Sequence, residues 1–132
     1  AKTFSRATRV TFANRPEVAM SAAPEFGGDA GRLNPEELFT ASLAACQMLT
    51  YLHMAARSGV AVVSYVDASE GELAFHEGKL RMTRVTLRPA ITIAAGSDPT
   101  LAEALVERAH AECFIASSVT TEVHTEATIT VA

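Results

Sequence analysis

The spacing of hydrophobic residues has a period of two over most of the chain and a helical period in two segments. The alternating segments predict strands, bounded by turn residues such as Asn14–Pro16 and His76–Lys79. Because Pro89 has no backbone N–H, we expect its strand to lie at a sheet edge or to carry a bulge there. The predicted strands are two within residues 1–23, a hairpin formed by 60–75 and 80–94, and a last strand over 123–131.

The first predicted helix begins after Asn34, which can cap it, and runs to about Ser58, because Gly59 is a natural stop. Nineteen consecutive positions between Glu37 and Arg57 carry no charge. A membrane span would explain this uncharged stretch, but polar residues interrupt it. We therefore prefer a helix that is buried on most sides, because a surface helix would show a polar stripe. A domain of this size has little interior, so we expect part of the helix to meet another subunit.

The second predicted helix opens at Ser97-Asp98-Pro99 and places Leu101, Leu105, Ala109 and Cys113 on one face. The resulting order of elements is β-β-α-β-β-α-β, which is typical of an α+β fold. We predict a single domain over residues 1–132, because this length leaves no room for a second.

Composition narrows the function classes. The net charge of −4 argues against a nucleic-acid-binding protein, which normally presents a basic face. Residues 1–10 contain no apolar signal region, and two cysteines are too few for a secreted disulfide scaffold, so we expect a cytoplasmic protein. If the cysteines have a function, it is as thiols.

The candidate chemistry centres on Cys46, in the uncharged helix, and Cys113, near the end of the second helix. Taken by themselves, both fit either small core residues or a redox pair that only tertiary folding can assemble. His110 and Cys113 have the spacing of a metal pair, but no second pair completes a site. His53 is interpreted as a core or interface histidine, and Glu36 as either a helix-dipole residue or part of a site.

Three segments resemble the OsmC/Ohr family, the osmotically induced and organic-hydroperoxide-resistance proteins. They are Asn34–Cys46, Ala109–Cys113 and Ser64–Leu73. The likeness spans roughly residues 4–131. It implies an α+β fold with a long buried central helix and an intertwined homodimer. It also implies that Cys46 is the peroxidatic thiol, that Cys113 resolves it as a disulfide, and that Glu36 belongs to the active site.

The resemblance therefore predicts a cysteine-based peroxidase that reduces organic hydroperoxides without a cofactor. An external dithiol recycles it, a lipoyl-bearing protein being one candidate reductant. The alternative is a non-enzymatic dimeric domain that binds a small apolar molecule and has structural cysteines. Two features depart from the family pattern. Phe114 follows Cys113 where the family often has proline, and no motif decides whether Arg6, Arg15 or Arg32 serves the thiolate.

Glu36 and Cys46 are ten residues apart, which on one straight helix corresponds to about 15 Å of rise and about 80° of rotation. A glutamate side chain cannot span that separation. If Glu36 serves Cys46, either the helix breaks between them or Glu36 comes from a second subunit. Good helix formers and no Pro or Gly lie between the two residues, so the second arrangement is preferred.

Overall fold

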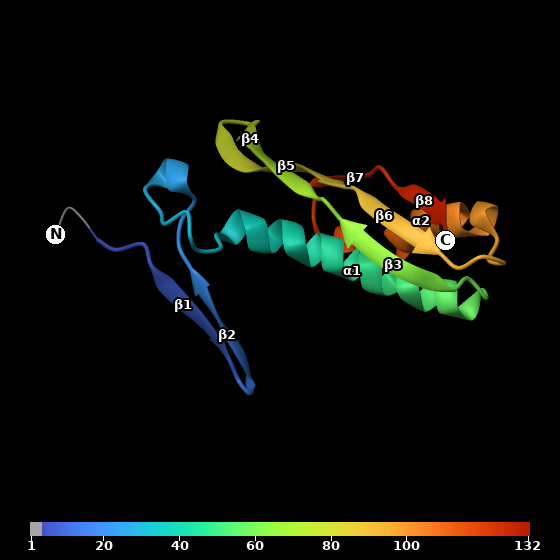
Figure 1. Cartoon of the computed structure of the whole chain (residues 1–132). Coiled ribbons are helices and arrows are strands. Elements are labelled where there is room, and N and C mark those ends of the chain that lie inside the picture. The colour runs from blue at the N-terminus through green and yellow to red at the C-terminus, as the bar shows by residue number, and fades with distance from the viewer. Residues whose placement is uncertain (1–3) are drawn as a thin grey trace. The chain divides into compact units, whose positions relative to one another are not determined.

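The computed structural model describes residues 4–132. The chain forms two compact units, residues 1–39 and 40–132, of which the second contains both sheets with three strands (Figure 1). Each unit has its own antiparallel strand pairing, and each is described by itself. That residues 1–132 form a single domain stays a prediction.

The first unit is built on an antiparallel hairpin of β1 (Thr8–Phe12) and β2 (Arg15–Met20), as the sequence predicts. The turn places Asn14 in the left-handed region with φ 59°. A single 3-10 turn, Pro24–Phe26, follows the hairpin. Gly28 packs so closely on the chain that an added Cβ would overlap the backbone of Ala22, so no larger residue fits there.

Helix α1 (Pro35–Arg57) begins and ends where the sequence predicts. At its start, the side chain of Asn34 accepts a hydrogen bond from the Glu37 N–H at 2.9 Å. The Asn34 N–H donates in return to Glu37 Oε1 at 3.0 Å. This reciprocal pair is a capping box. At its end, Gly59 adopts φ 78°, and the Val60 N–H donates to the Ala55 carbonyl at 2.9 Å. Local hydrogen bonds thus define both ends of the helix.

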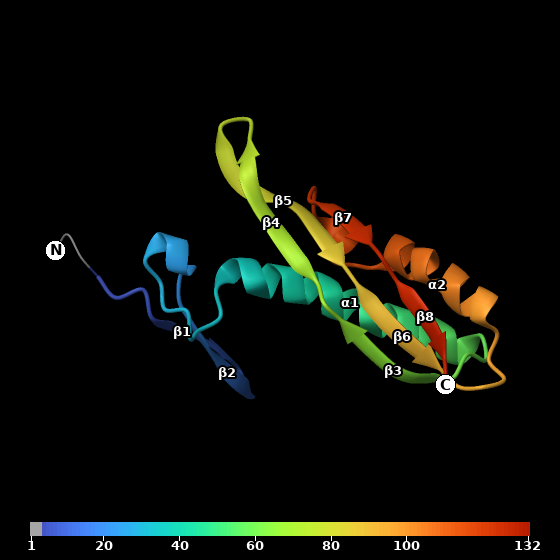
Figure 2. The same cartoon turned by 45° about the horizontal axis from the view of Figure 1, so that its top comes forward.

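The second unit contains two three-stranded sheets, which Figure 2 shows running one after the other along the strand direction. Their strand orders are β4-β5-β7 and β3-β6-β8. β5 pairs with β7 and β6 with β8 in parallel, and the remaining pairs are antiparallel. The strands are β3 (Val62–Asp67), β4 (Glu70–His76), β5 (Lys79–Leu87), β6 (Pro89–Ile93), β7 (Glu122–Thr125) and β8 (Thr128–Val131).

The predicted hairpin is confirmed, but each of its arms is broken into two strands, as is the predicted last strand. The break in the second arm lies at Arg88, whose backbone N–H donates to the side chain of Asp67 at 2.7 Å and leaves the strand ladder. Pro89 is the first residue of β6, which is the central strand of its sheet. The edge-strand alternative is therefore wrong, because a strand can begin at proline in the middle of a sheet. The irregularity expected as the other alternative takes the form of the strand break at Arg88.

The core of the second unit lies between the two helices and β6. Helix α2 (Pro99–Glu112) is capped by Asp98, which accepts from the Thr100 N–H at 2.9 Å. Both helices contribute to one buried cluster with Ile91 and Ile93, which point to the same face of β6. The Tyr51 hydroxyl of α1 donates to the Ala102 carbonyl of α2 at 2.8 Å and ties the helices together. The cluster comprises Tyr51, Met54, Ala55, Val60, Ile91, Ile93, Ala102, Leu105, Val106 and Ala109.

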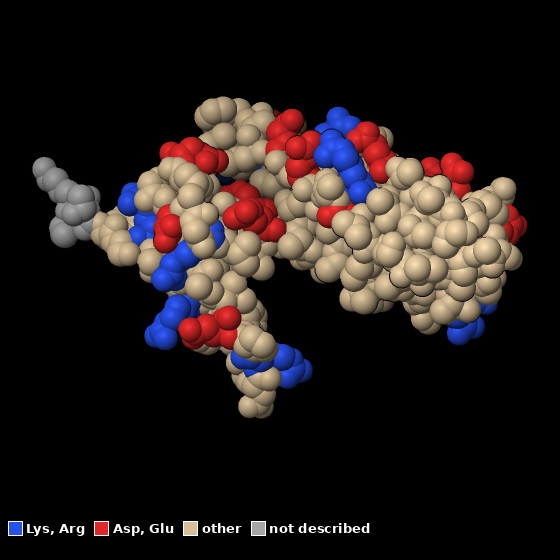
Figure 3. All heavy atoms as spheres, in the orientation of Figure 1, with Lys and Arg blue, Asp and Glu red and all other residues tan. Residues whose placement is uncertain are grey.

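Only one face of α1 is buried in the single chain, so burial on most sides stays a prediction that depends on a second subunit. The buried positions recur every three or four residues, and Leu49 on another face is 62% exposed. Much of the second unit's face in Figure 3 carries neither acidic nor basic side chains. No helix among the described residues is both long enough and apolar enough to cross a membrane. That α1 meets a second subunit stays a prediction.

Candidate active site at Cys46

Folding brings together two thiols that are 67 positions apart in the sequence. Cys46 is half-buried in the middle of α1. Cys113 is the residue that ends α2; its N–H donates to the His110 carbonyl at 3.3 Å, and it is only 1% exposed. Both cysteines are free thiols, and their side chains are hydrogen-bonded to each other.

The surroundings of Cys46 favour its thiolate. Burial alone raises the pKa of this thiol, because a charged group is poorly solvated there. Hydrogen bonds to the sulfur from the Ile115 backbone, the Cys113 thiol and the Phe114 backbone outweigh burial, so the pKa lies below its usual value. The Thr50 hydroxyl, which also lies at the sulfur, donates its hydrogen to the Cys46 carbonyl at 2.8 Å. Cys46 is therefore the better nucleophile of the pair.

Cys113 has the opposite tendency. Burial raises the pKa of its thiol, and its hydrogen bond to Cys46 and the negative charge there raise it further. Backbone hydrogen bonds from Ala116 and Ile115 lower it, but less. Of the two thiols, Cys46 therefore loses its proton at the lower pH and Cys113 keeps its proton to higher pH. The pair combines a buried thiol of raised pKa with a partly accessible thiol of lowered pKa.

Cys46 opens into a cavity of about 800 Å³, a size typical of small-molecule sites. One wall is α1, along which Cys46 and His53 are separated by two helical turns, about 10 Å of rise. The other wall is the segment that ends α2. Two large apolar side chains at the cavity are unusually exposed, Leu49 at 62% and Phe114 at 82%. The lining residues are Cys46, Leu49, Thr50, His53, Met54, Glu112 and Phe114.

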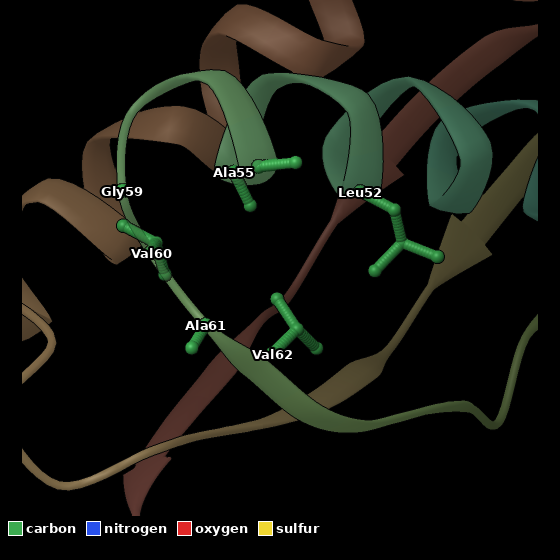
Figure 4. A pocket seen from close by; sticks show the side chains of 7 residues that line it. Leu52, Ala55, Gly59, Val60, Ala61 and Val62 are labelled. Carbon is green, nitrogen blue, oxygen red and sulfur yellow. The ribbon is translucent and has the colours of Figure 1, made fainter.

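A second cavity, of about 470 Å³, lies where α1 turns into β3 (Figure 4). Its lining is aliphatic or glycine throughout and contains no nucleophile or titratable side chain. Unlike the Cys46 cavity, it therefore offers no group that could react with a ligand. The residues around this second cavity are Leu52, Ala55, Ala56, Gly59, Val60, Ala61 and Val62.

The remaining predicted site residues lie in the first unit. Glu36 is half-buried in the first turn of α1, which continues without interruption to Arg57, so the alternative of a broken helix is not observed. That Glu36 serves Cys46 of another subunit stays a prediction. The three candidate arginines each have a neighbour within their own unit. Arg6 lies over the Phe4 ring at 4.5 Å, Arg15 donates to the Asn14 carbonyl at 3.0 Å, and Arg32 donates to the Thr8 carbonyl at 3.1 Å.

His53 is exposed in the single chain and lines the Cys46 cavity, so it is not a core histidine, and its interpretation as an interface histidine stays a prediction. Sequence reasoning missed Thr50, although its position four residues after Cys46 places it one helical turn away. It also missed the backbone donors of Phe114 and Ile115, which leave no signal in a sequence. Over residues 4–132, no group of three or more potential metal ligands is assembled.

Comparison with known proteins agrees with this architecture. The family model described as OsmC-like protein matches residues 27–128. An OsmC-like protein of unknown function from Vibrio cholerae is 38% identical in sequence. The structural match covers 94% of this chain and 85% of the Vibrio cholerae chain, with a TM-score of 0.90. The chain belongs to the OsmC-like family.

Two more distant relatives extend the comparison. An organic hydroperoxide resistance protein from Legionella pneumophila shares the fold, with a TM-score of 0.66, 24% identity and 98% coverage of both chains. The uncharacterized protein YmaD of Bacillus subtilis is 26% identical over 104 residues, which are 76% of this chain and 69% of that protein. The predicted α+β, OsmC-like fold is thus confirmed.

Proposed function

We propose that this protein is a thiol peroxidase that reduces organic hydroperoxides, with Cys46 as the attacking residue and Cys113 as the resolving residue. The observation that carries the proposal is the unequal thiol pair. Cys46 is partly accessible, its pKa is lowered, and it faces a largely apolar cavity, whereas Cys113 is buried and its pKa is raised. Names of relatives such as the Legionella pneumophila protein add support for hydroperoxides as substrates.

The chemistry needs only these two side chains and an external reductant. The Cys46 thiolate attacks the hydroperoxide, the O–O bond breaks, and the leaving alkoxide takes a proton to become an alcohol. Cys46 becomes a sulfenic acid, a two-electron oxidation of its sulfur. The Cys113 sulfur then displaces the sulfenic oxygen, which leaves as water with the Cys113 proton, and a Cys46–Cys113 disulfide forms.

A dithiol restores the enzyme by two exchange steps and is itself oxidised to a disulfide. A lipoyl-bearing protein has the required chemistry. We further propose that the active unit is a homodimer in which Glu36 of one chain orients an arginine beside Cys46 of the other. The carboxylate does not act on the thiol directly, because an unshielded negative charge would raise the pKa of Cys46.

Thiol counting tests the function. One equivalent of cumene hydroperoxide should consume two thiols per chain and yield one equivalent of alcohol. Cys46→Ser should abolish the reaction. Cys113→Ser should complete one turnover and stop as a Cys46 sulfenic acid or a more oxidised form, which mass spectrometry identifies. If the wild-type thiols persist under these conditions, the protein is instead a binding domain with structural cysteines.

A further inference from the structure

We propose that the Phe114 side chain sets the substrate selectivity of the Cys46 site by providing an aromatic wall for the organic group of an aryl hydroperoxide. This inference rests on the proposed function. Phe114 is the aromatic residue among the hydrophobic residues that line the cavity with Cys46, and it is 82% exposed. A Phe ring so exposed beside a reactive thiol has an apolar face free to pack against an aryl group.

The backbone around Phe114 is held firmly although its ring is exposed. On one side, the Cys113 N–H donates to the His110 carbonyl at 3.3 Å. On the other, the Phe114 carbonyl accepts from the Ser118 hydroxyl at 2.8 Å, and its backbone N–H hydrogen-bonds to the Cys46 sulfur. The base of the side chain is thus held beside the cavity that contains Cys46. A side chain anchored in this way loses less freedom when a substrate packs against it than one on a mobile loop would.

The ring and the backbone of Phe114 have separable roles. The backbone N–H stabilises the thiolate whatever the substrate, and replacing the side chain by Ala keeps it. The ring can contact only the organic group of a hydroperoxide, and aromatic pairs gain from offset or edge-to-face packing. Hydrogen peroxide has no such group. Loss of the ring should therefore slow the reaction with an aryl substrate more than the reaction with hydrogen peroxide.

Single-turnover oxidation of the reduced protein tests this without any reductant. The rate constant of thiol loss is measured under excess cumene hydroperoxide, tert-butyl hydroperoxide or hydrogen peroxide, for the wild type, Phe114→Ala and Phe114→Leu. We expect Phe114→Ala to lower the ratio of the cumene to the hydrogen peroxide rate constant about tenfold, the factor that corresponds to about 1.4 kcal/mol. Phe114→Leu keeps apolar volume without the ring, so its ratio of rate constants should lie between those of the wild type and Phe114→Ala.

Phe75→Ala is the matched control, because Phe75 is also an exposed phenylalanine, at 75%, but lies on β4 and does not line the cavity. It should leave all three rate constants unchanged. An unchanged substrate ratio in Phe114→Ala refutes the selectivity role. So does an equal loss for all three oxidants, especially with a changed sedimentation coefficient, which identifies Phe114 as a contact between subunits. If the wild type reacts with none of the oxidants, the proposed function itself fails.

Discussion

The hydrogen bond from Cys113 to the Cys46 thiolate can be tested with two substitutions at one position. Cys113→Ala removes the donor, whereas Cys113→Ser replaces the thiol with a hydroxyl that can still donate to the Cys46 sulfur. Both variants lack the second thiol, so any remaining thiol titration belongs to Cys46. The comparison separates hydrogen bonding from the loss of the resolving cysteine.

The expected magnitude follows from the number of donors at the sulfur. Cys113 is one of three donors to the Cys46 sulfur, with the backbone N–H groups of Phe114 and Ile115, because the Thr50 hydroxyl donates to the Cys46 carbonyl. A hydrogen bond to a charged group contributes about 1.5–3 kcal/mol, and water at a half-buried thiol replaces part of it. We therefore expect a net loss of about 1 kcal/mol in Cys113→Ala, which is about a fivefold lower ratio of thiolate to thiol at a fixed pH.

The assay is the ultraviolet absorbance of the thiolate as a function of pH. The Cys46 pKa is lowered in the wild type, so losing a donor moves the midpoint to higher pH. The thiolate fraction then falls most between the two midpoints and is unaffected well above them. Absorbance is preferred to alkylation rates, because a thiolate of higher pKa is intrinsically more nucleophilic and partly masks the effect. Coincident titrations of the Ala and Ser variants would show that Cys113 does not stabilise the thiolate.

Four further results are expected. Tyr51→Phe, which removes the hydroxyl that donates to the Ala102 carbonyl at 2.8 Å, should lower the free energy of unfolding in urea by about 0.5–1.5 kcal/mol; an unchanged value means that the bond contributes nothing. Gly28→Ala should destabilise by about 1–3 kcal/mol, because the new methyl would overlap backbone, whereas Gly31→Ala meets only the Asp29 side chain and should be milder. Sedimentation should give a homodimer, and a stable folded monomer at micromolar concentration would contradict this. Mixed Cys46→Ser and Glu36→Gln chains should recover activity in heterodimers if each homodimer is inactive, and no recovery in verified heterodimers rules out the cross-subunit role of Glu36.

The sequence by itself determined the features that depend on neighbours along the chain. Asn34 and Glu37 are three residues apart, so their reciprocal hydrogen bonds depend only on local sequence. The same is true of the left-handed glycine that ends α1. The same holds for the Asp98 cap of α2. The motif around Cys46 identified the family for a related reason, since its residues are contiguous in the chain.

Tertiary structure decided what depends on residues far apart. The break between β5 and β6 requires the side chain of Asp67 to accept from the Arg88 N–H, a contact across 21 positions that alternation cannot reveal. The exposed face of α1 likewise depends on where α2 and the sheets pack, because the helix is apolar on more sides than one chain covers.

The state of the thiols is the clearest case. Periodicity placed Cys46 and Cys113 on two helices but left open whether they are core residues or a pair. Their contact exists because α1 and α2 pack against the same strand. The pKa of Cys46 is the lower of the two because backbone N–H groups from the segment after α2 reach the Cys46 sulfur. Every residue except proline has such a group, so only its position in space, set by the fold, gives it this role.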